Sequence, residues 1–422
     1  RIGEMYFLRG HFYFILKNVF GHIPFVDENT PDADYETTPN TLPNDEQWQK
    51  IAADFKKAYD LLPATQAQKG RATKGAAAAY LAKTYLYKAY RQSENNSVTS
   101  INSQDLQEVL TYTSAVLGSA YGLEDDFAFN FLPGGYENGK ESLFAVQYSV
   151  DDGTQYGSLN WGDQLSTPQK LGCCDFHKPS QNLVNAFKTV NGLPDFDNFN
   201  NNDYNAANDK ADPRLFHTVA LPGLPYKYNT ELIYKNDWNR NSNVYGFYAS
   251  LKENVDPSCS CFRNINPFRA NSKNRIVIRY ADVLLMRAEA LIELNRSNEA
   301  LPLINQVRQR AKQSTSMIPY ATNANIALYQ DGVNITWNQE NARKALRWER
   351  RLEFAMEGSR FFDLVRWGIA DQVLNDYFTK EKTRRPAIFS SAYFTKNKNE
   401  YIPIPQNQIG YVKGIYKQNA GF

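Results

Sequence analysis

Apolar residues recur at helical spacing towards both ends of this chain, whereas its middle shows no such period. Between Met5 and Phe20, apolar side chains return every third or fourth position, which is the pattern of one face of an α-helix. Gly21 follows directly and is a typical helix stop. The same reasoning predicts helices over residues 5–20, 45–62, 73–87, 103–117, 280–294, 300–312, 338–356 and 360–375.

The predicted helices come in pairs joined by short turns, which favours stacked helical hairpins. Their spacing does not follow the strict period of tetratricopeptide repeats, so we interpret them as diverged repeats of that kind. From Gly118 to Ser272, short β-prone runs such as 142–150 and 218–221 alternate with clusters of Gly, Pro and Asn. The predicted fold class is therefore mainly α: a tetratricopeptide-like α-superhelix with a large loop-rich insertion that carries a few short strands.

Charge and composition argue against several classes of function. The 422 residues carry 47 Lys and Arg against 45 Asp and Glu, so the chain lacks the basic excess typical of nucleic-acid binding. No run of about 18 apolar residues occurs, which argues against a membrane-spanning helix. Aromatic residues make up 14% of the chain, and we expect some of them to do more than fill the core.

The start of the chain and its cysteines each support one expectation. The chain begins inside a predicted helix, without an initiator Met or a signal peptide, so we expect an N-terminal portion to be missing.

The cysteines form two close pairs, Cys173 with Cys174 and Cys259 with Cys261. Zinc ligands usually have longer spacers, so we expect a disulfide between the two regions, or free thiols, in preference to zinc.

A charged segment near the C-terminal end carries a family resemblance. Residues 347–368, RWERRLEFAMEGSRFFDLVRWG, closely resemble a signature of the SusD/RagB family of outer-membrane nutrient-binding lipoproteins. Other segments resemble this family in the family's own order: EMYFLRGHFYF (4–14), FGHIPF (20–25), NGLP (191–194), DPRL (212–215), RYADVLLMRAEA (279–290), YIPIP (401–405) and QNAG (418–421). Together these segments extend over nearly the whole chain.

The resemblance implies a fold, a location and a set of partners. It implies one SusD-like unit with helical repeats over 1–117, an irregular insertion with ligand-binding loops over 118–275, and helical repeats with a C-terminal tail over 276–422. It implies a non-catalytic protein on the outer face of the outer membrane, held by an N-terminal lipid anchor that this chain does not contain. The implied partners are an oligosaccharide ligand and a SusC-like TonB-dependent transporter, with no cofactor and no nucleic acid.

The charged signature itself is interpreted as structural. Arg350 lies one helical turn from Glu353, and Glu353 lies one turn from Glu357, so like charges would repel unless partners intervene. The available partners within the segment are Arg347, Arg351 and Arg360. In the segment 279–290, Asp282 and Glu289 would likewise face Arg279 and Arg287. We expect buried ion pairs that hold helices in register, and no ligand contact.

Aromatic residues outside the helices are the candidate ligand-binding residues. Sugar rings pack their C–H faces on Tyr and Trp, while amides and acids bind the hydroxyls. The three candidate clusters are Asp32, Asp34 and Tyr35 after the first helix; Tyr156 and Trp161 beside Gln155, Asn160 and Asp163; and Tyr226, Tyr228, Trp238 and Tyr245 beside Asn236, Asp237, Asn239 and Arg240. The family resemblance also implies that ligands bind in loops at these positions.

Several alternatives stay open at this point. The RagB branch of the family would favour peptide capture, and helical repeats can act as pure protein-interaction scaffolds. An all-helical glycosidase would need paired carboxyl groups, whose separation is a spatial property that the sequence does not reveal. Asp195, Asp197 and Asp203 resemble a Ca²⁺ loop, but they lack the Gly and the terminal Glu of such loops, so a structural Ca²⁺ is a minor hypothesis.

Overall fold

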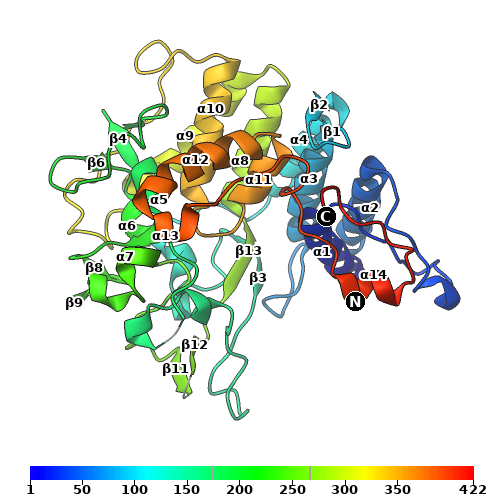
Figure 1. The fold of residues 1–422 in the computed structure, drawn as a ribbon, viewed down its shortest axis with the longest axis horizontal. Helices are drawn as coiled ribbons and strands as arrows, with labels where there is room; N and C mark the ends of the chain where they lie inside the picture. The colour runs from blue at the N-terminus through cyan, green and yellow to red at the C-terminus, as the bar shows by residue number, and fades with distance from the viewer. Residues whose placement is uncertain (173, 266–267) are drawn as a thin grey trace. The chain divides into compact units, whose positions relative to one another are not determined.

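The computed structural model describes residues 1–172, 174–265 and 268–422 (Figure 1). These residues divide into two compact units. Unit 1 contains Arg1–Ser119, Phe361–Glu381 and Ser391–Phe422, and unit 2 contains Ala120–Arg360 and Lys382–Ser390. The described chain is mostly helical, which confirms the predicted α-rich, repeat-like fold class.

Unit 1 is built on successive helical hairpins. Its first helices are α1 (Ile2–Phe20), α2 (Asn44–Leu61), α3 (Lys74–Ala89) and α4 (Ser103–Leu117), and each packs on the next. Phe7, Phe55 and Tyr80 form the centre of this packing, with the Phe55 and Tyr80 rings stacked at 4.9 Å. Gly10 is required here because a Cβ atom at this position would lie 3.0 Å from the Phe55 ring.

The remaining elements of unit 1 are short. Strands β1 (Tyr90–Gln92) and β2 (Val98–Ile101) form an antiparallel hairpin between α3 and α4 that the sequence pattern did not predict. Later elements lying wholly or mostly in this unit are α11 (Arg360–Arg366), α12 (Ala370–Arg384) and α14 (Gln406–Tyr411). The single helix predicted over 360–375 is wrong. The chain breaks at Gly368, whose φ of 66° leaves the helical region.

Unit 2 combines a helical part with many short strands. Its long helices α8 (Tyr280–Glu293), α9 (Ser297–Gln313) and α10 (Gln339–Glu353) pack on one another. Its shorter helices are α5 (Gln181–Ala186), α6 (Arg214–Thr218), α7 (Ser242–Tyr245) and α13 (Pro386–Phe389). Strand β3 (Ser142–Val146), within the predicted run 142–150, pairs antiparallel with β13 (Arg275–Arg279), which leads directly into α8.

Further short strands shape the loops of unit 2. They are β4 (Lys188–Val190), β5 (Leu193–Pro194), β6 (Lys210–Ala211), β7 (Val219–Ala220), β8 (Pro225–Tyr226), β9 (Asn229–Ile233), β10 (Ala249–Ser250), β11 (Phe262–Ile265) and β12 (Phe268–Asn271). They pair as two-stranded ladders, apart from the three-stranded group β5–β4–β6. The irregular middle of the chain is therefore held by local pairing and by side-chain packing, because no extended sheet runs through its described residues.

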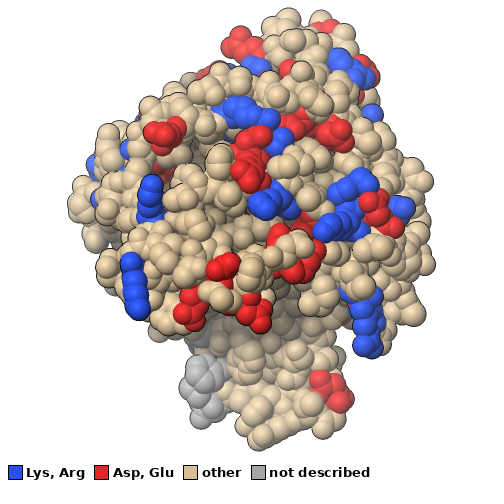
Figure 2. Space-filling model, turned by 90° about the vertical axis from the view of Figure 1, so that its right-hand side faces the viewer, with Lys and Arg blue, Asp and Glu red and all other residues tan. Residues whose placement is uncertain are grey.

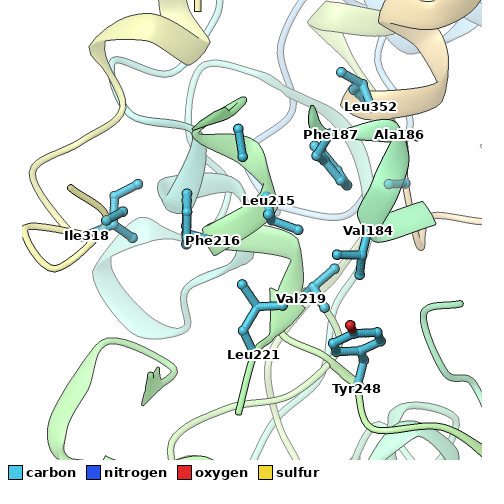
Figure 3. Packing of buried hydrophobic residues seen from close by; sticks show 13 residues of the cluster. Val184, Ala186, Phe187, Leu215, Phe216, Val219, Leu221, Tyr248, Ile318 and Leu352 are labelled. Atoms are coloured by element: carbon cyan, nitrogen blue, oxygen red, sulfur yellow. The ribbon is translucent and has the colours of Figure 1, made fainter. Parts of the chain in front are cut away.

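A hydrophobic core under these loops ties them to the helical part of unit 2. Figure 3 shows Leu215 and Phe216 of α6 beside Val184 and Phe187, with Leu352 of α10 above them. All five residues are buried. Burial of this apolar surface gives the loop-rich region a rigid base, at roughly 25 cal/mol per Å² removed from water.

The charged signature forms a buried network in unit 2, which confirms its structural interpretation. Glu353 of α10 accepts hydrogen bonds from Arg279 at 2.5 Å, from Arg214 at 3.0 Å and from Arg310. Burial opposes the ionisation of Glu353, and these guanidinium groups more than offset it, so the pKa of Glu353 lies well below its ordinary value.

The partners in this network differ from those that the local spacing offered. Among the residues that the structure describes, Arg351 forms no ion pair with an acid; its guanidinium lies over the rings of Trp348 and Phe199. Arg279 pairs with Glu141, Glu353 and Glu357, and not with the acids of its own segment. The reason is that ion pairs between different elements form only when the tertiary fold brings those elements together.

Two further expectations concern disulfides and membranes. Cys259 forms a disulfide with Cys261, so both expectations for this pair, a bridge to the other cysteine region or free thiols, are wrong. Cys173 lies outside the described residues. Among residues 1–172, 174–265 and 268–422, no helix has both the length and the apolar character needed to cross a bilayer.

Candidate functional site

The first candidate cluster lies on an exposed loop of unit 1. Asp32 and Asp34 begin and end a 3₁₀ turn, and Tyr35 follows it, with all three side chains open to solvent. A hydrogen bond between Tyr35 and Asp32 raises the pKa of the tyrosine. The structure therefore brings Asp32 and Tyr35 together, and their role as ligand contacts stays a prediction.

The second cluster lies on a loop of unit 2 that its own hydrogen bonds hold in shape. The backbone N–H of Ser149 donates to the carbonyl of Ser158, which closes the loop that carries Tyr156. Hydroxyl groups of Ser149 and Thr154 donate to Asp152 and lower the pKa of this carboxyl to about 2. The Gln155 amide donates to the phenol oxygen of Tyr156 at 2.9 Å. Both Tyr156 and, further along, Trp161 are exposed.

The third cluster separates into buried and exposed residues, and this corrects the sequence prediction. Tyr226 is 0% exposed and Trp238 is 6% exposed, because both rings pack with Tyr234 in an internal aromatic cluster. Tyr228 is also largely enclosed, and its hydroxyl lies 3.1 Å from Nδ1 of His217. Tyr226 and Trp238 therefore cannot offer a ring to a ligand in this structure, whereas Tyr228 is half-buried. Tyr245, by contrast, is 43% exposed.

We give the name arginine–aromatic patch to a group made of Phe176, Arg240 and Tyr245. Phe176 and Tyr245 are exposed, and Arg240 is half-buried. The guanidinium carbon of Arg240 lies 4.8 Å from the centre of the Phe176 ring and 5.0 Å from that of Tyr245. Such cation–π contacts hold planar groups in defined positions at a protein surface.

Buried hydrogen bonds fix the segments that carry the patch. The backbone N–H of Arg240 donates to Asp175 at 2.8 Å, and Lys178 donates to the other oxygen of the same carboxylate at 2.6 Å. The hydroxyl of Tyr234 donates to Asn239 at 2.8 Å. The patch therefore rests on a rigid polar and aromatic base.

The same region is joined to the loop of Trp161. The backbone N–H of Phe176 donates to the carbonyl of Leu165 at 2.8 Å, and that of Asp175 donates to Thr167 at 3.0 Å. Leu165 lies in the 3₁₀ turn Asp163–Ser166, and this turn begins two residues after Trp161. Backbone pairing thus places the second cluster and the exposed part of the third in one region of unit 2.

Sequence reasoning missed one member of the patch. Phe176 was not selected because only Tyr and Trp outside the helices were treated as platforms for sugars. An aromatic residue in a polar loop, directly before His177 and Lys178, was the available signal. Asn236 and Asp237, selected as polar neighbours, are exposed next to the buried Trp238.

The hypothetical Ca²⁺ loop does not gather its acids. Asp195 accepts from the backbone of Asn198, Asp197 pairs with Lys344, and Asp203 accepts from Asn185. Within the described residues there is no cluster of three or more His, Cys, Asp and Glu side chains that could hold a metal ion.

The charge pattern of the surface agrees with the near-neutral composition. On the face drawn in Figure 2, basic and acidic side chains are interspersed among uncharged ones. The described residues on this face form no extended basic surface of the kind that phosphate backbones require.

Comparison with known protein families gives two matches that together extend over most of the chain. A family model described as the SusD family matches residues 140–422. A second model, described as starch-binding and associating with the outer membrane, matches residues 2–86.

Individual relatives agree with these matches. SusD-like protein P2 of Formosa agariphila is 26% identical over 99% of this chain and 73% of the relative. A SusD-like carbohydrate-binding protein from Bacteroides fragilis has a similar fold, with a TM-score of 0.72 and 24% identity over 98% of this chain and 78% of that one. A laminarin-binding SusD-like protein has a TM-score of 0.63 and 23% identity over 100% of this chain and 78% of that one.

Proposed function

This chain belongs to the SusD family, and from that premise we propose that it is a non-catalytic glycan-binding protein of the outer membrane. In this proposal it faces the cell exterior, is held there by an N-terminal lipid anchor, and passes oligosaccharides to a SusC-like TonB-dependent transporter. The names of its relatives, which include carbohydrate-binding and laminarin-binding proteins, support the ligand class.

The observation that carries the proposal is the arginine–aromatic patch with its neighbouring exposed rings. Phe176, Tyr245 and Trp161 expose aromatic surface, while Arg240 and Asn236 supply hydrogen-bonding groups. An oligosaccharide presents both C–H faces and hydroxyl groups, so a rigid surface of rings and polar groups suits it. Because the loops are held by buried hydrogen bonds, binding would require little ordering of the protein.

Calorimetric titration with a panel of oligosaccharides tests this function. We expect micromolar to millimolar affinity for at least one glycan class, as is typical of small, exposed sites. Failure to bind every polysaccharide fragment tried would contradict the proposal. Binding of peptides in place of glycans would instead favour peptide capture.

The proposal that the protein is not an enzyme is supported by the state of the carboxyl group next to the patch. Glycoside hydrolysis uses two carboxyl groups, one of which must donate a proton. The carboxylate under the patch, Asp175, already accepts from Lys178 and from the backbone of Arg240. We expect no reducing sugar to be released when the protein is incubated with a glycan that it binds; release that is lost on mutation of a single acid would overturn this expectation.

One feature of unit 1 supports a protein partner. Helix α1 has an exposed apolar face in addition to its buried one, made of Ile2, Met5, Leu8, Phe12, Ile15 and Leu16. Exposed apolar surface of this kind commonly marks a contact with another protein. We expect the double change Phe12→Glu and Ile15→Glu to reduce recovery of the chain with its transporter from outer-membrane extracts. The matched change Val333→Glu, at an exposed residue of unit 2, should leave recovery unchanged.

A further inference from the structure

A small polar cavity in unit 2 is close to the two segments that carry Trp161 and Phe176. Asp163, two residues after Trp161, lines the cavity. His177, directly after Phe176, forms a hydrogen bond with Glu253, another lining residue. The cavity has a volume of about 50 Å³. This space holds several waters or one polar substituent, since a single water needs about 10–15 Å³. The charged residues that line it are Asp163, Lys252, Glu253, Lys273, Arg275 and Glu357.

Two acids at the cavity, Asp163 and Glu253, are buried and lie close to cationic side chains. The side chain of Asp163 is 1% exposed, and it accepts from Arg275 at 3.0 Å and from Lys273 at 3.4 Å. Glu253 is 11% exposed at its side chain; Nδ1 of His177 lies 2.8 Å from its Oε1, and Nη1 of Arg275 lies 4.0 Å from the same oxygen. One carboxylate oxygen therefore has both cationic groups close to it.

The solvent-facing side of this cluster is positive. His177 and Arg275 expose 46% and 45% of their side chains, in contrast to the acids below them. Within the part of the chain that the structure describes, Nε2 of His177 and Nη2 of Arg275 make no hydrogen bond. These N–H groups are therefore available to an acceptor arriving from solvent.

The balance of charge favours an anionic acceptor. Asp163 and Glu253 balance Lys273 and Arg275, so protonated His177 leaves the cluster with one positive charge in excess. The hydrogen bond that Nδ1 of His177 donates to Glu253 raises the pKa of His177, which keeps the ring charged closer to neutral pH. The other charged groups on the cavity wall pair among themselves: Lys252 donates to Glu357, and Glu357 also accepts from Arg279.

We propose that His177 and Arg275 form a subsite for the anionic group of an acidic glycan, a uronate carboxylate or a sulfate ester, next to the ring of Phe176. This inference rests on the proposed glycan-binding function and specifies the ligand class. Charge-assisted hydrogen bonds from an imidazolium and a guanidinium are about twice as strong as neutral ones. The subsite would therefore select acidic glycans over neutral ones of the same shape.

The first test compares matched ligands by calorimetry. Oligogalacturonate, its carboxyl-reduced form and a sulfated galacto-oligosaccharide separate carboxylate, neutral and sulfate binding. We expect at least one acidic ligand to bind about tenfold more tightly than the carboxyl-reduced ligand near pH 6. Equal affinity for acidic and neutral forms would overturn this inference and leave the glycan-binding proposal standing, whereas no binding of any glycan would overturn both.

Variants identify the residues responsible. Arg275→Gln and His177→Gln should each remove most of the preference for the acidic ligand, while binding of the neutral ligand stays within about twofold. Lys344→Gln removes an equally exposed cation elsewhere in unit 2 and should change neither. Arg275→Lys, which keeps the charge over Asp163, should retain part of the preference and guards against loss of folding. A preference that survives both Gln variants would contradict the assignment.

The dependence on pH provides an independent readout. Because the charged form of His177 binds the anion, affinity for the acidic ligand should fall as the pH rises through the pKa of His177, which lies above its ordinary value of 6.5. The neutral ligand should show no such change, and His177→Gln should abolish it. A pH profile that is unchanged in His177→Gln would contradict the role of this residue.

Discussion

Strand β13 begins and ends with an arginine, and the two residues have opposite environments. Arg279 is 2% exposed and makes five hydrogen bonds, one for each of its N–H groups, to Glu141, Glu353 and Glu357. Arg275 exposes 45% of its side chain, which makes one hydrogen bond within the described part of the chain, to Asp163. A guanidinium whose donors are all used holds the fold together, whereas one with donors left over can bind a ligand.

The aromatic residues of unit 2 show the same contrast. Trp238 and Tyr226 are enclosed, and their rings fill space between loop segments. Tyr245 and Trp161 come from the same kind of loop sequence, yet their rings are exposed. Changes at buried positions should therefore lower stability, and changes at exposed positions should lower affinity.

The largest effect is expected from Glu353→Gln. This change removes the negative charge shared by Arg214, Arg279 and Arg310, and leaves buried guanidinium groups without full compensation. We expect the free energy of unfolding to fall by about 3–5 kcal/mol. Urea denaturation measures it, and Lys344→Gln, which breaks the exposed pair with Asp197, should cost no more than about 1 kcal/mol. Similar losses in the two variants would contradict the distinction between buried and exposed ion pairs.

Acid should weaken the same network without any mutation. The pKa values of Glu353 and Glu357 are lowered in the folded state, because nearby cations outweigh the effect of burial. Groups of this kind contribute stability above their unfolded pKa, about 4.3 for Glu, and lose it as the pH falls further. The urea midpoint should therefore drop steeply below about pH 4.5. In Glu353→Gln this drop should be smaller, and an equal drop would contradict the assignment.

Trp238→Ala should lower the stability of the fold and leave glycan affinity almost unchanged. Removing a buried indole leaves a cavity against Tyr226 and Tyr234, at a cost of about 3 kcal/mol or more. Thermal unfolding measures the loss. At a temperature where the variant is folded, its glycan affinity should stay within about threefold of the parent. A stable variant with strongly reduced affinity would show that Trp238 contacts ligand after all.

Trp161→Ala and Tyr245→Ala should show the reverse pattern. If their rings pack on sugar, each change should reduce glycan affinity by about 1–3 kcal/mol. Because both side chains are exposed, the unfolding temperature should move by no more than a few degrees. Tyr393→Ala, at an exposed tyrosine of unit 1, serves as the control. Unchanged affinity in both variants would remove these residues from the site.

The helical part of the molecule could be predicted in detail, because its signal is local. The expected helices over 5–20, 45–62 and 103–117 each begin or end within a few residues of α1, α2 and α4. The exception is the break at Gly368. There, the apolar pattern predicted a continuous helix, but Gly368 has a φ of 66°, which glycine adopts without steric cost and which leaves the helical region.

The candidate site could be predicted only in part. The sequence placed Tyr156, Trp161 and Tyr245 outside the helices. All three are exposed, although Tyr245 is the last residue of the short helix α7. The sequence selected Tyr226 and Trp238 by the same rule, although their burial depends on contacts with Tyr234 that no local pattern reveals.

By itself, the sequence determined the helix periods, the irregular middle, the near-neutral charge and the family, because each of these is written in neighbouring residues or in contiguous motifs. The tertiary structure decided which acid meets which arginine and which rings reach solvent. Glu353 and Arg279, for example, are 74 residues apart along the chain. Burial and pairing are properties of distances in space, so only the folded chain can separate the arginine that stabilises it from the arginine that is free to bind.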